Sequence, residues 1–116
     1  MGLAARLNLK PGMSLRVVGR PAGVDLGDAA VGGAAAADGV LVFVKTLADV
    51  DKKAGPAVEA AAADRLAWIA YPKAGQLGTN LSRDILWRHL KPRGIEGVRL
   101  IAIDHVWSAM RFRPAK

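Results

Sequence analysis

The stretch Gly39-Val-Leu-Val-Phe-Val-Lys45 holds an unbroken apolar run between a glycine and a lysine. Its β-branched residues favour a strand, and the lack of polar alternation predicts burial on both faces, as in a parallel sheet. A second run of this kind, Arg65-Leu-Ala-Trp-Ile-Ala-Tyr71, is stopped by Pro72. Strands that need cover on both faces predict an α/β domain, with other elements packed on each side of a sheet.

Three more segments have the pattern of strands. Met110–Arg113 alternates apolar and basic residues, which predicts an antiparallel strand with one wetter face. Asp104–Ala109 then connects it to the strand before it as a hairpin turn. The expected strands are Ser14–Gly19, Gly97–Ile103 and Met110–Arg113.

Helices are expected between the strands. Thr46 is a predicted N-cap, with Asp49 in the first turn, and Gly55-Pro56 should break the helix that runs to Ala63. A short helix is expected over residues 3–9, and another over residues 82–90 with Ser82 or Asn80 as its cap. The Gly/Ala segment 26–38 stays open between helix and loop, as does a cis Tyr71-Pro72 bond.

The order of these elements alternates between strand and helix. It predicts one α/β domain over residues 1–116, with a three-layer, Rossmann-like arrangement. The sheet is expected to have about five strands, mostly parallel, and to end in an antiparallel hairpin.

Composition narrows the class of protein. The chain has no cysteine, which excludes a disulfide framework and thiolate metal sites and fits a reducing, cytoplasmic setting. The first residues lack the pattern of a signal peptide, and no run has the length of a membrane span, so no membrane association is expected.

Charge is unevenly distributed. Residues 1–64 hold seven basic and seven acidic residues, whereas residues 65–116 hold ten basic and three acidic ones. The formal charge of +7 therefore comes from the second half. Such an excess permits binding of phosphates or larger polyanions, and it also serves solubility.

Several motifs resemble known families. Leu9-Lys-Pro-Gly-Met-Ser-Leu-Arg-Val-Val-Gly19 resembles the entry to the first strand of the class I methyltransferase fold, and the closing hairpin resembles its last two strands. Nearly the whole chain is similar to a small bacterial family of unknown function with a degenerate fold of that kind. The motifs that carry this similarity are Lys10-Pro-Gly12, Phe43-Val-Lys45, Trp68-Ile-Ala-Tyr-Pro-Lys73, Arg83-Asp84 and Ile103-Asp-His-Val-Trp-Ser-Ala-Met-Arg-Phe-Arg113.

The departures from an active methyltransferase favour a domain without that activity. The turn that would approach S-adenosylmethionine reads Gly19-Arg-Pro-Ala-Gly23, so Arg20 and Pro21 stand where the resemblance requires small residues. No second strand supplies an acidic residue for the cofactor ribose. We therefore expect no cofactor and no methyl transfer.

The candidate site lies at the carboxyl ends of the parallel strands, where ligands of open α/β sheets bind. Helix N-termini and basic side chains at this edge favour a small anion, held by Lys73 and Arg83 on the loop that joins them. The candidate residues are Arg20, Lys45, Lys73, Asn80, Ser82, Arg83, Asp104, His105 and Trp107.

Alternatives remain for the same residues. The main expectation is a non-catalytic ligand-binding or regulatory domain, with no catalytic residue assigned. A small enzyme acting on an anionic substrate would use Lys45, Lys73, Asp104 and His105. Trp107 is expected to stack a base or, more simply, to pack against the core.

Metal and macromolecular sites have weaker support. His89 and His105 lie far apart in the chain and predict no metal site. A basic stripe of Arg99, Arg111 and Arg113 is an alternative surface for nucleic acid, although no recognised motif supports it. An uncovered sheet edge is an alternative surface for self-association or for a protein partner.

Overall fold

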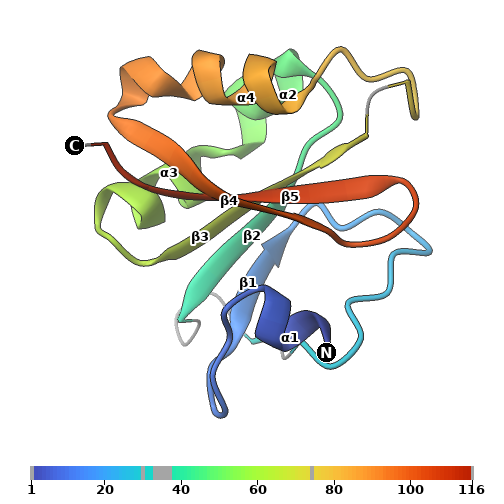
Figure 1. Ribbon diagram of the computed structural model, residues 1–116, viewed down its shortest axis with the longest axis vertical. Helices are drawn as coiled ribbons and strands as arrows, with labels where there is room; N and C mark the ends of the chain where they lie inside the picture. The colour runs from blue at the N-terminus through green and yellow to red at the C-terminus, as the bar shows by residue number, and fades with distance from the viewer. Residues whose placement is uncertain (1, 30, 33–37, 74, 116) are drawn as a thin grey trace.

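The computed structural model describes residues 2–29, 31–32, 38–73 and 75–115. It has an open, mixed five-stranded sheet with helices packed against it (Figure 1). The elements in chain order are α1 (Leu3–Arg6), β1 (Leu15–Val18), β2 (Gly39–Phe43), α2 (Leu47–Lys53), α3 (Gly55–Ala62), β3 (Leu66–Pro72), α4 (Arg83–Leu90), the 3-10 helix η2 (Lys91–Arg93), β4 (Ile95–Ala102) and β5 (Trp107–Pro114).

The strand order across the sheet is β1-β2-β3-β5-β4. β1 pairs with β2, and β2 with β3, in parallel; Leu41 of β2 lies opposite Trp68 of β3. β5 enters between β3 and β4 and is antiparallel to both, so that these two strands share a direction. The last strand of the chain is therefore internal, and β4 becomes an outer strand.

Both faces of the central strands are covered. Alternate residues such as Val42 and Ile69 pack with α2, α3 and α4 in one apolar cluster. The residues between them, such as Leu41 and Trp68, pack on the other face with apolar side chains of segments 3–9 and 24–29. This explains why β2 and β3 have continuous apolar runs: every residue of both strands is buried.

The predicted helix starts are confirmed. The Thr46 side chain accepts a hydrogen bond from the Asp49 N–H at 3.2 Å, and the Asp49 carboxylate accepts one from the Lys45 N–H at 2.9 Å. Ser82 caps α4 by accepting from the Ile85 N–H. The Gly55-Pro56 break is also confirmed, because α2 ends at Lys53 and α3 begins at Gly55.

One expectation needs adjustment, and two open questions are answered. β5 begins at Trp107, earlier than expected, because Asp104 closes a shorter turn. The part of the 26–38 segment that the structure describes contains no helix, and Val31 makes a single parallel bridge to Leu15 of β1. The Tyr71-Pro72 bond is trans, since no peptide bond within the described residues is cis.

Trp68 joins the sheet to the N-terminal segment. Its ring is fully buried in β3, and its Nε1–H donates a hydrogen bond of 2.9 Å to the Leu7 carbonyl oxygen, just after α1. The expectation that Trp68 belongs to the core of a central strand is confirmed. The indole both fills the core and satisfies a main-chain acceptor.

Replacing Trp68 with alanine is expected to lower the free energy of unfolding by about 3–5 kcal/mol, because it opens a cavity and leaves the Leu7 carbonyl without its donor. Chemical denaturation monitored by far-UV circular dichroism measures the change. Trp87→Ala is the matched control, since that residue is 40% exposed and lies outside the apolar clusters of the core. An equal loss in both variants would contradict the role assigned to Trp68.

Candidate functional site

A hollow of about 210 Å³ opens at the carboxyl ends of β1 and β2. Its walls come from the turns after these strands, from α2 and from the start of β5. We call it the β1–β2 hollow; it is lined by Gly19, Pro21, Phe43, Val44, Lys45, Asp49, Lys53 and Trp107. Ligands of open α/β sheets bind at this edge, so the hollow is the first place to look for a site.

The turn after β1 shapes one wall. Gly19 has a φ of +73°, a conformation that side chains with a Cβ adopt at a cost. A Cβ there would also lie 3.2 Å from the Phe43 carbonyl oxygen. Glycine at this position therefore lets the chain leave β1 close to β2 and brings Pro21 over the hollow.

Two lysines and one carboxylate set the charge of the hollow. Lys45 follows β2, and Lys53 ends α2. Asp49 lies between them in the chain: one of its oxygens accepts from the Lys45 N–H, and the other is 4.0 Å from the Lys53 Nζ. The carboxylate is thus partly engaged by main chain, and the side chains that line the hollow sum to +1.

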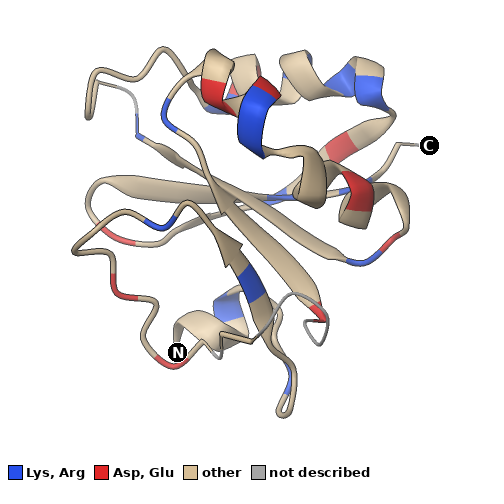
Figure 2. Ribbon diagram, turned by 180° about the vertical axis from the view of Figure 1, so that it is seen from behind, with Lys and Arg blue, Asp and Glu red and all other residues tan. Residues whose placement is uncertain are grey.

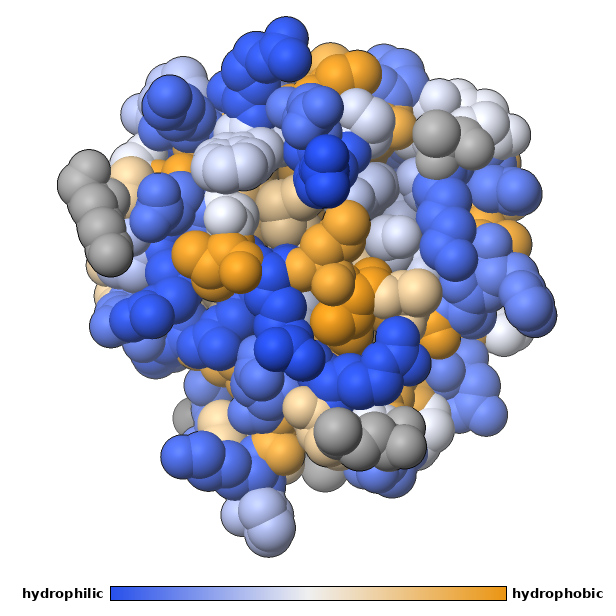
Figure 3. All heavy atoms as spheres, viewed as in Figure 1, coloured by the Kyte–Doolittle hydropathy of each residue, from blue (hydrophilic) through white to orange (hydrophobic). Residues whose placement is uncertain are grey.

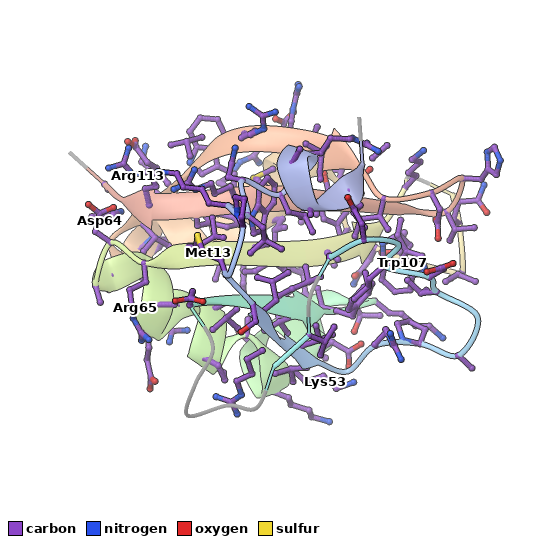
Figure 4. The ribbon with its side chains drawn as sticks, turned by 90° about the horizontal axis from the view of Figure 1, so that it is seen from below. Met13, Lys53, Asp64, Arg65, Trp107 and Arg113 are labelled. Carbon is purple, nitrogen blue, oxygen red and sulfur yellow. The ribbon has the colours of Figure 1, made fainter. Side chains whose placement is uncertain are left out.

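An aromatic pair forms the apolar wall. The Phe43 and Trp107 rings meet edge to face, with centroids 5.2 Å apart, and both side chains are buried. Trp107 therefore packs against the core and leaves little of its surface to a ligand. Figure 4 labels Trp107 of β5 and Lys53 of α2, which reach the hollow from different elements.

The loop from Lys73 to Arg83 uses its polar groups for structure. The Thr79 hydroxyl donates to the Lys45 carbonyl oxygen and accepts from the Leu81 N–H. Asn80 accepts from the Leu47 N–H at 3.0 Å, which ties the loop to the start of α2. The side chain of Arg83, largely exposed, pairs with Asp84 at 3.6 Å.

The polar groups of the hairpin turn between β4 and β5 also hold the local structure. One oxygen of Asp104 accepts hydrogen bonds from the N–H groups of Val106 and Trp107, each at 2.8 Å. His105 is exposed in the turn, and the Lys73 N–H donates to the Val106 carbonyl oxygen. Within the described residues, no ion pair joins Asp104 to a lysine. The carboxylate thus holds the turn.

The structure therefore divides the predicted site residues into groups. Lys45 and Trp107 line the hollow, and Arg20 lies between two lining residues, Gly19 and Pro21. Six others do not line it: Lys73, Asn80, Ser82, Arg83, Asp104 and His105. The sequence analysis treated Asp49 only as a helix-start residue and did not include Lys53. These two residues are four positions apart, so they lie on the same face of one helix, and that spacing could have identified Lys53.

The basic residues of the second half are spread over α4, η2, β4 and β5, and Figure 2 shows basic positions on many elements. Three of them, Arg99, Arg111 and Arg113, lie close enough that their charges affect one another, as the expected basic stripe requires. Arg113 is held by Asp64 through two hydrogen bonds, of 3.1 and 3.3 Å (Figure 4). The Arg111 guanidinium donates to the Asn8 side chain, and burial lowers its pKa.

Besides Arg111, whose pKa is lowered, two groups have a raised pKa: Arg113, through its hydrogen bond with Asp64, and Tyr71, near the end of β3. Burial raises the pKa of its phenol, and the positive charge of Arg83 partly offsets that change. The phenol thus stays neutral at neutral pH and belongs to the core cluster under α4. It contributes no charge to the carboxyl edge of the sheet.

In the described ranges, no three His, Asp or Glu side chains gather as metal ligands would. None of the helices described has the length and apolar character that crossing a membrane requires. No protein-family model matches the chain, and neither a curated protein nor a solved structure shows significant similarity to it.

Replacing Asp104 with alanine is expected to lower the free energy of unfolding by about 1–2 kcal/mol, because two hydrogen bonds of the turn are lost. Asp104→Asn keeps an acceptor oxygen and should recover most of that loss. His105→Ala, in the same turn, should change stability little. Thermal denaturation of the three variants tests the assignment; equal stability of Asp104→Ala and the parent would contradict it.

Proposed function

We propose that this chain is a non-catalytic domain that binds a small anionic ligand in the β1–β2 hollow. The observation that carries the proposal is the position of this hollow at the carboxyl ends of two parallel strands, with Lys45 and Lys53 in its wall. An open α/β sheet offers its ligand site at this edge. The lysines supply charge where a phosphate or carboxylate group would enter.

The electrostatic argument rests on the partners of Asp49. This carboxylate already accepts a hydrogen bond from main chain, and its distance from the Lys53 Nζ is 4.0 Å, at the outer limit of an ion pair. The side chains that line the hollow carry two positive charges and one negative charge, so an anion there would meet a net charge of +1. The overall charge of +7 would also favour its approach from solution.

We further propose that the fold is a reduced, three-layer, Rossmann-like form of the methyltransferase type, matching a small bacterial family of unknown function. Support comes from the parallel strands β1, β2 and β3, from cover on both sheet faces, and from the closing hairpin. The absence of cysteine supports a cytoplasmic setting.

The alternative of an enzyme that uses Lys45, Lys73, Asp104 and His105 has less support. Of these four residues only Lys45 lines the β1–β2 hollow. Asp104 accepts two main-chain hydrogen bonds on one oxygen and closes a turn. We therefore assign no reaction to this group.

Inorganic phosphate is expected to raise the melting temperature more than chloride does at equal ionic strength. In the proposed site each lysine contributes about 1 kcal/mol to binding, so Lys45→Gln and Lys53→Gln should each weaken the phosphate affinity about fivefold. Differential scanning fluorimetry over a phosphate series measures this.

The matched control is the pair Lys73→Gln and Arg83→Gln, which changes two cationic side chains that do not line the hollow. This pair should respond to phosphate as the parent does. Loss of the phosphate response in the control pair, with retention in the lysine variants, would move the site to the loop between Lys73 and Arg83 and overturn the proposal.

S-adenosylmethionine is expected not to bind at micromolar concentration. Pro21 lines the hollow, where the backbone would have to approach the methionine end of the cofactor. Isothermal titration calorimetry should give no measurable heat, while phosphate in the same instrument serves as the positive control. A micromolar or tighter dissociation constant would show that the site accepts the cofactor despite Arg20 and Pro21.

A further inference from the structure

The outer strand β4 leaves a long edge open. β4 has eight residues and pairs with β5 on one side only, and no other strand in the described part of the chain pairs with it. Its exposed backbone groups are a template for a further strand. Three of its central residues, Val98, Arg99 and Leu100, are exposed. Two exposed aliphatic side chains, Val98 and Leu100, thus flank the charged side chain of Arg99.

A groove accompanies this edge. A hollow of about 190 Å³ lies between α4 and β4, and we call it the β4 groove. Val98 is 48% exposed, Leu100 43% and Trp87 40%, and all three line the groove with buried Met110. Arg83 and Arg99 also belong to its lining. Figure 3 shows hydrophobic side chains among hydrophilic ones on the face where β4 lies toward the viewer.

A β-bulge shapes the groove. The register between β4 and β5 shifts between Gly97 and Arg99. A Cβ at Gly97 would overlap the Sδ atom of Met110, so a larger residue there would require the flexible Met110 side chain to move. The bulge interrupts the edge, and the Arg6 guanidinium donates to the Ala102 carbonyl oxygen, so Val98–Ile101 is the segment left to pair with a new strand.

The two faces of this segment differ in chemistry. Leu100 lies opposite Met110, which belongs to the apolar cluster under α4. Arg99 lies opposite Arg111, on the other face of the sheet. A strand added to β4 would thus meet mainly apolar side chains on the α4 face and Arg99 on the opposite face. Arg111 lies one strand further in, on β5, and donates to the Asn8 side chain.

We propose that β4 binds an extended segment of a partner protein in which apolar and acidic residues alternate. Apolar side chains of that segment would enter the β4 groove, and its carboxylates would face Arg99. Main-chain hydrogen bonds to the β4 edge would supply affinity, and the alternating side chains would supply specificity.

The charge of the edge favours this partner over a second copy of the chain, and the groove favours it over nucleic acid. A second copy of the chain paired through β4 would bring Arg99 close to its own counterpart, in molecules of charge +7. Like charges across a strand pair are unfavourable, whereas a carboxylate opposite Arg99 is favourable. Nucleic acid would satisfy the arginines but would not fill a groove made by Val98, Leu100 and Trp87.

The test uses fluorescence anisotropy with labelled heptapeptides. The probe alternates valine and glutamate; its controls are the valine–lysine peptide and a version N-methylated at two adjacent central residues, which lacks a donor on each edge. The probe should bind at least tenfold more tightly than either control. Equal binding of the N-methylated peptide would overturn strand addition, and equal binding of the lysine peptide would overturn the charge argument.

Variants locate the interaction. Leu100→Glu should weaken binding of the valine–glutamate peptide at least tenfold, whereas Leu77→Glu, at a position 51% exposed in another loop, should leave it unchanged. Arg99→Glu should reverse the preference toward the lysine peptide. Circular dichroism and melting temperature verify that each variant folds. Equal affinity in Leu100→Glu and Leu77→Glu would place the peptide elsewhere and overturn the proposal.

Two further measurements test whether a second copy of the chain or a nucleic acid occupies the β4 edge instead. Sedimentation velocity should give a monomer; a dimer that Leu100→Glu dissociates would identify a second copy as the occupant. A single-stranded oligonucleotide should not displace the peptide; displacement that depends on Arg99 and Leu100 would identify nucleic acid instead. Lys45→Gln should not affect the peptide, so this test is independent of the anion site.

Discussion

Two-sided burial of β2 and β3 is the constraint on which the rest of the structure depends. Every residue of both strands is buried, so each face of the sheet centre needs its own cover. Helices α2, α3 and α4 supply one cover, and the segments around α1 and residues 24–29 supply the other. The hydrogen bond from Trp68 to Leu7 ties the second cover to the sheet, because it satisfies a polar group that burial would otherwise leave unpaired.

This arrangement leaves the ends of the strands as the region where polar groups meet. Main-chain groups after β2 are satisfied by Asp49 and Thr79, and those of the hairpin turn by Asp104. The side chains that look catalytic by type are thus largely engaged in holding turns. The lysines at this edge are the exception, since Lys45 and Lys53 line a hollow whose described lining includes one carboxylate, that of Asp49.

The antiparallel hairpin changes the outer part of the sheet. By entering between β3 and β4, β5 buries its own apolar residues and moves β4 to the outside. An outer strand normally carries charges or a bulge that discourage pairing. β4 has both, in Arg99 and the shift at Gly97, yet it keeps Val98 and Leu100 exposed beside Trp87. The same edge can therefore discourage pairing with a basic strand and still accept a strand with apolar and acidic side chains.

The sequence by itself determined the elements and their caps. Continuous apolar runs identified β2 and β3, Thr46 and Ser82 marked helix starts, and Gly55-Pro56 marked the break, because these signals act between neighbouring residues. Only the tertiary structure decided which side chains share the β1–β2 hollow, and that β5 rather than β4 lies inside the sheet. Those outcomes depend on contacts between residues far apart in the chain. Local sequence patterns do not determine which strands pair with each other.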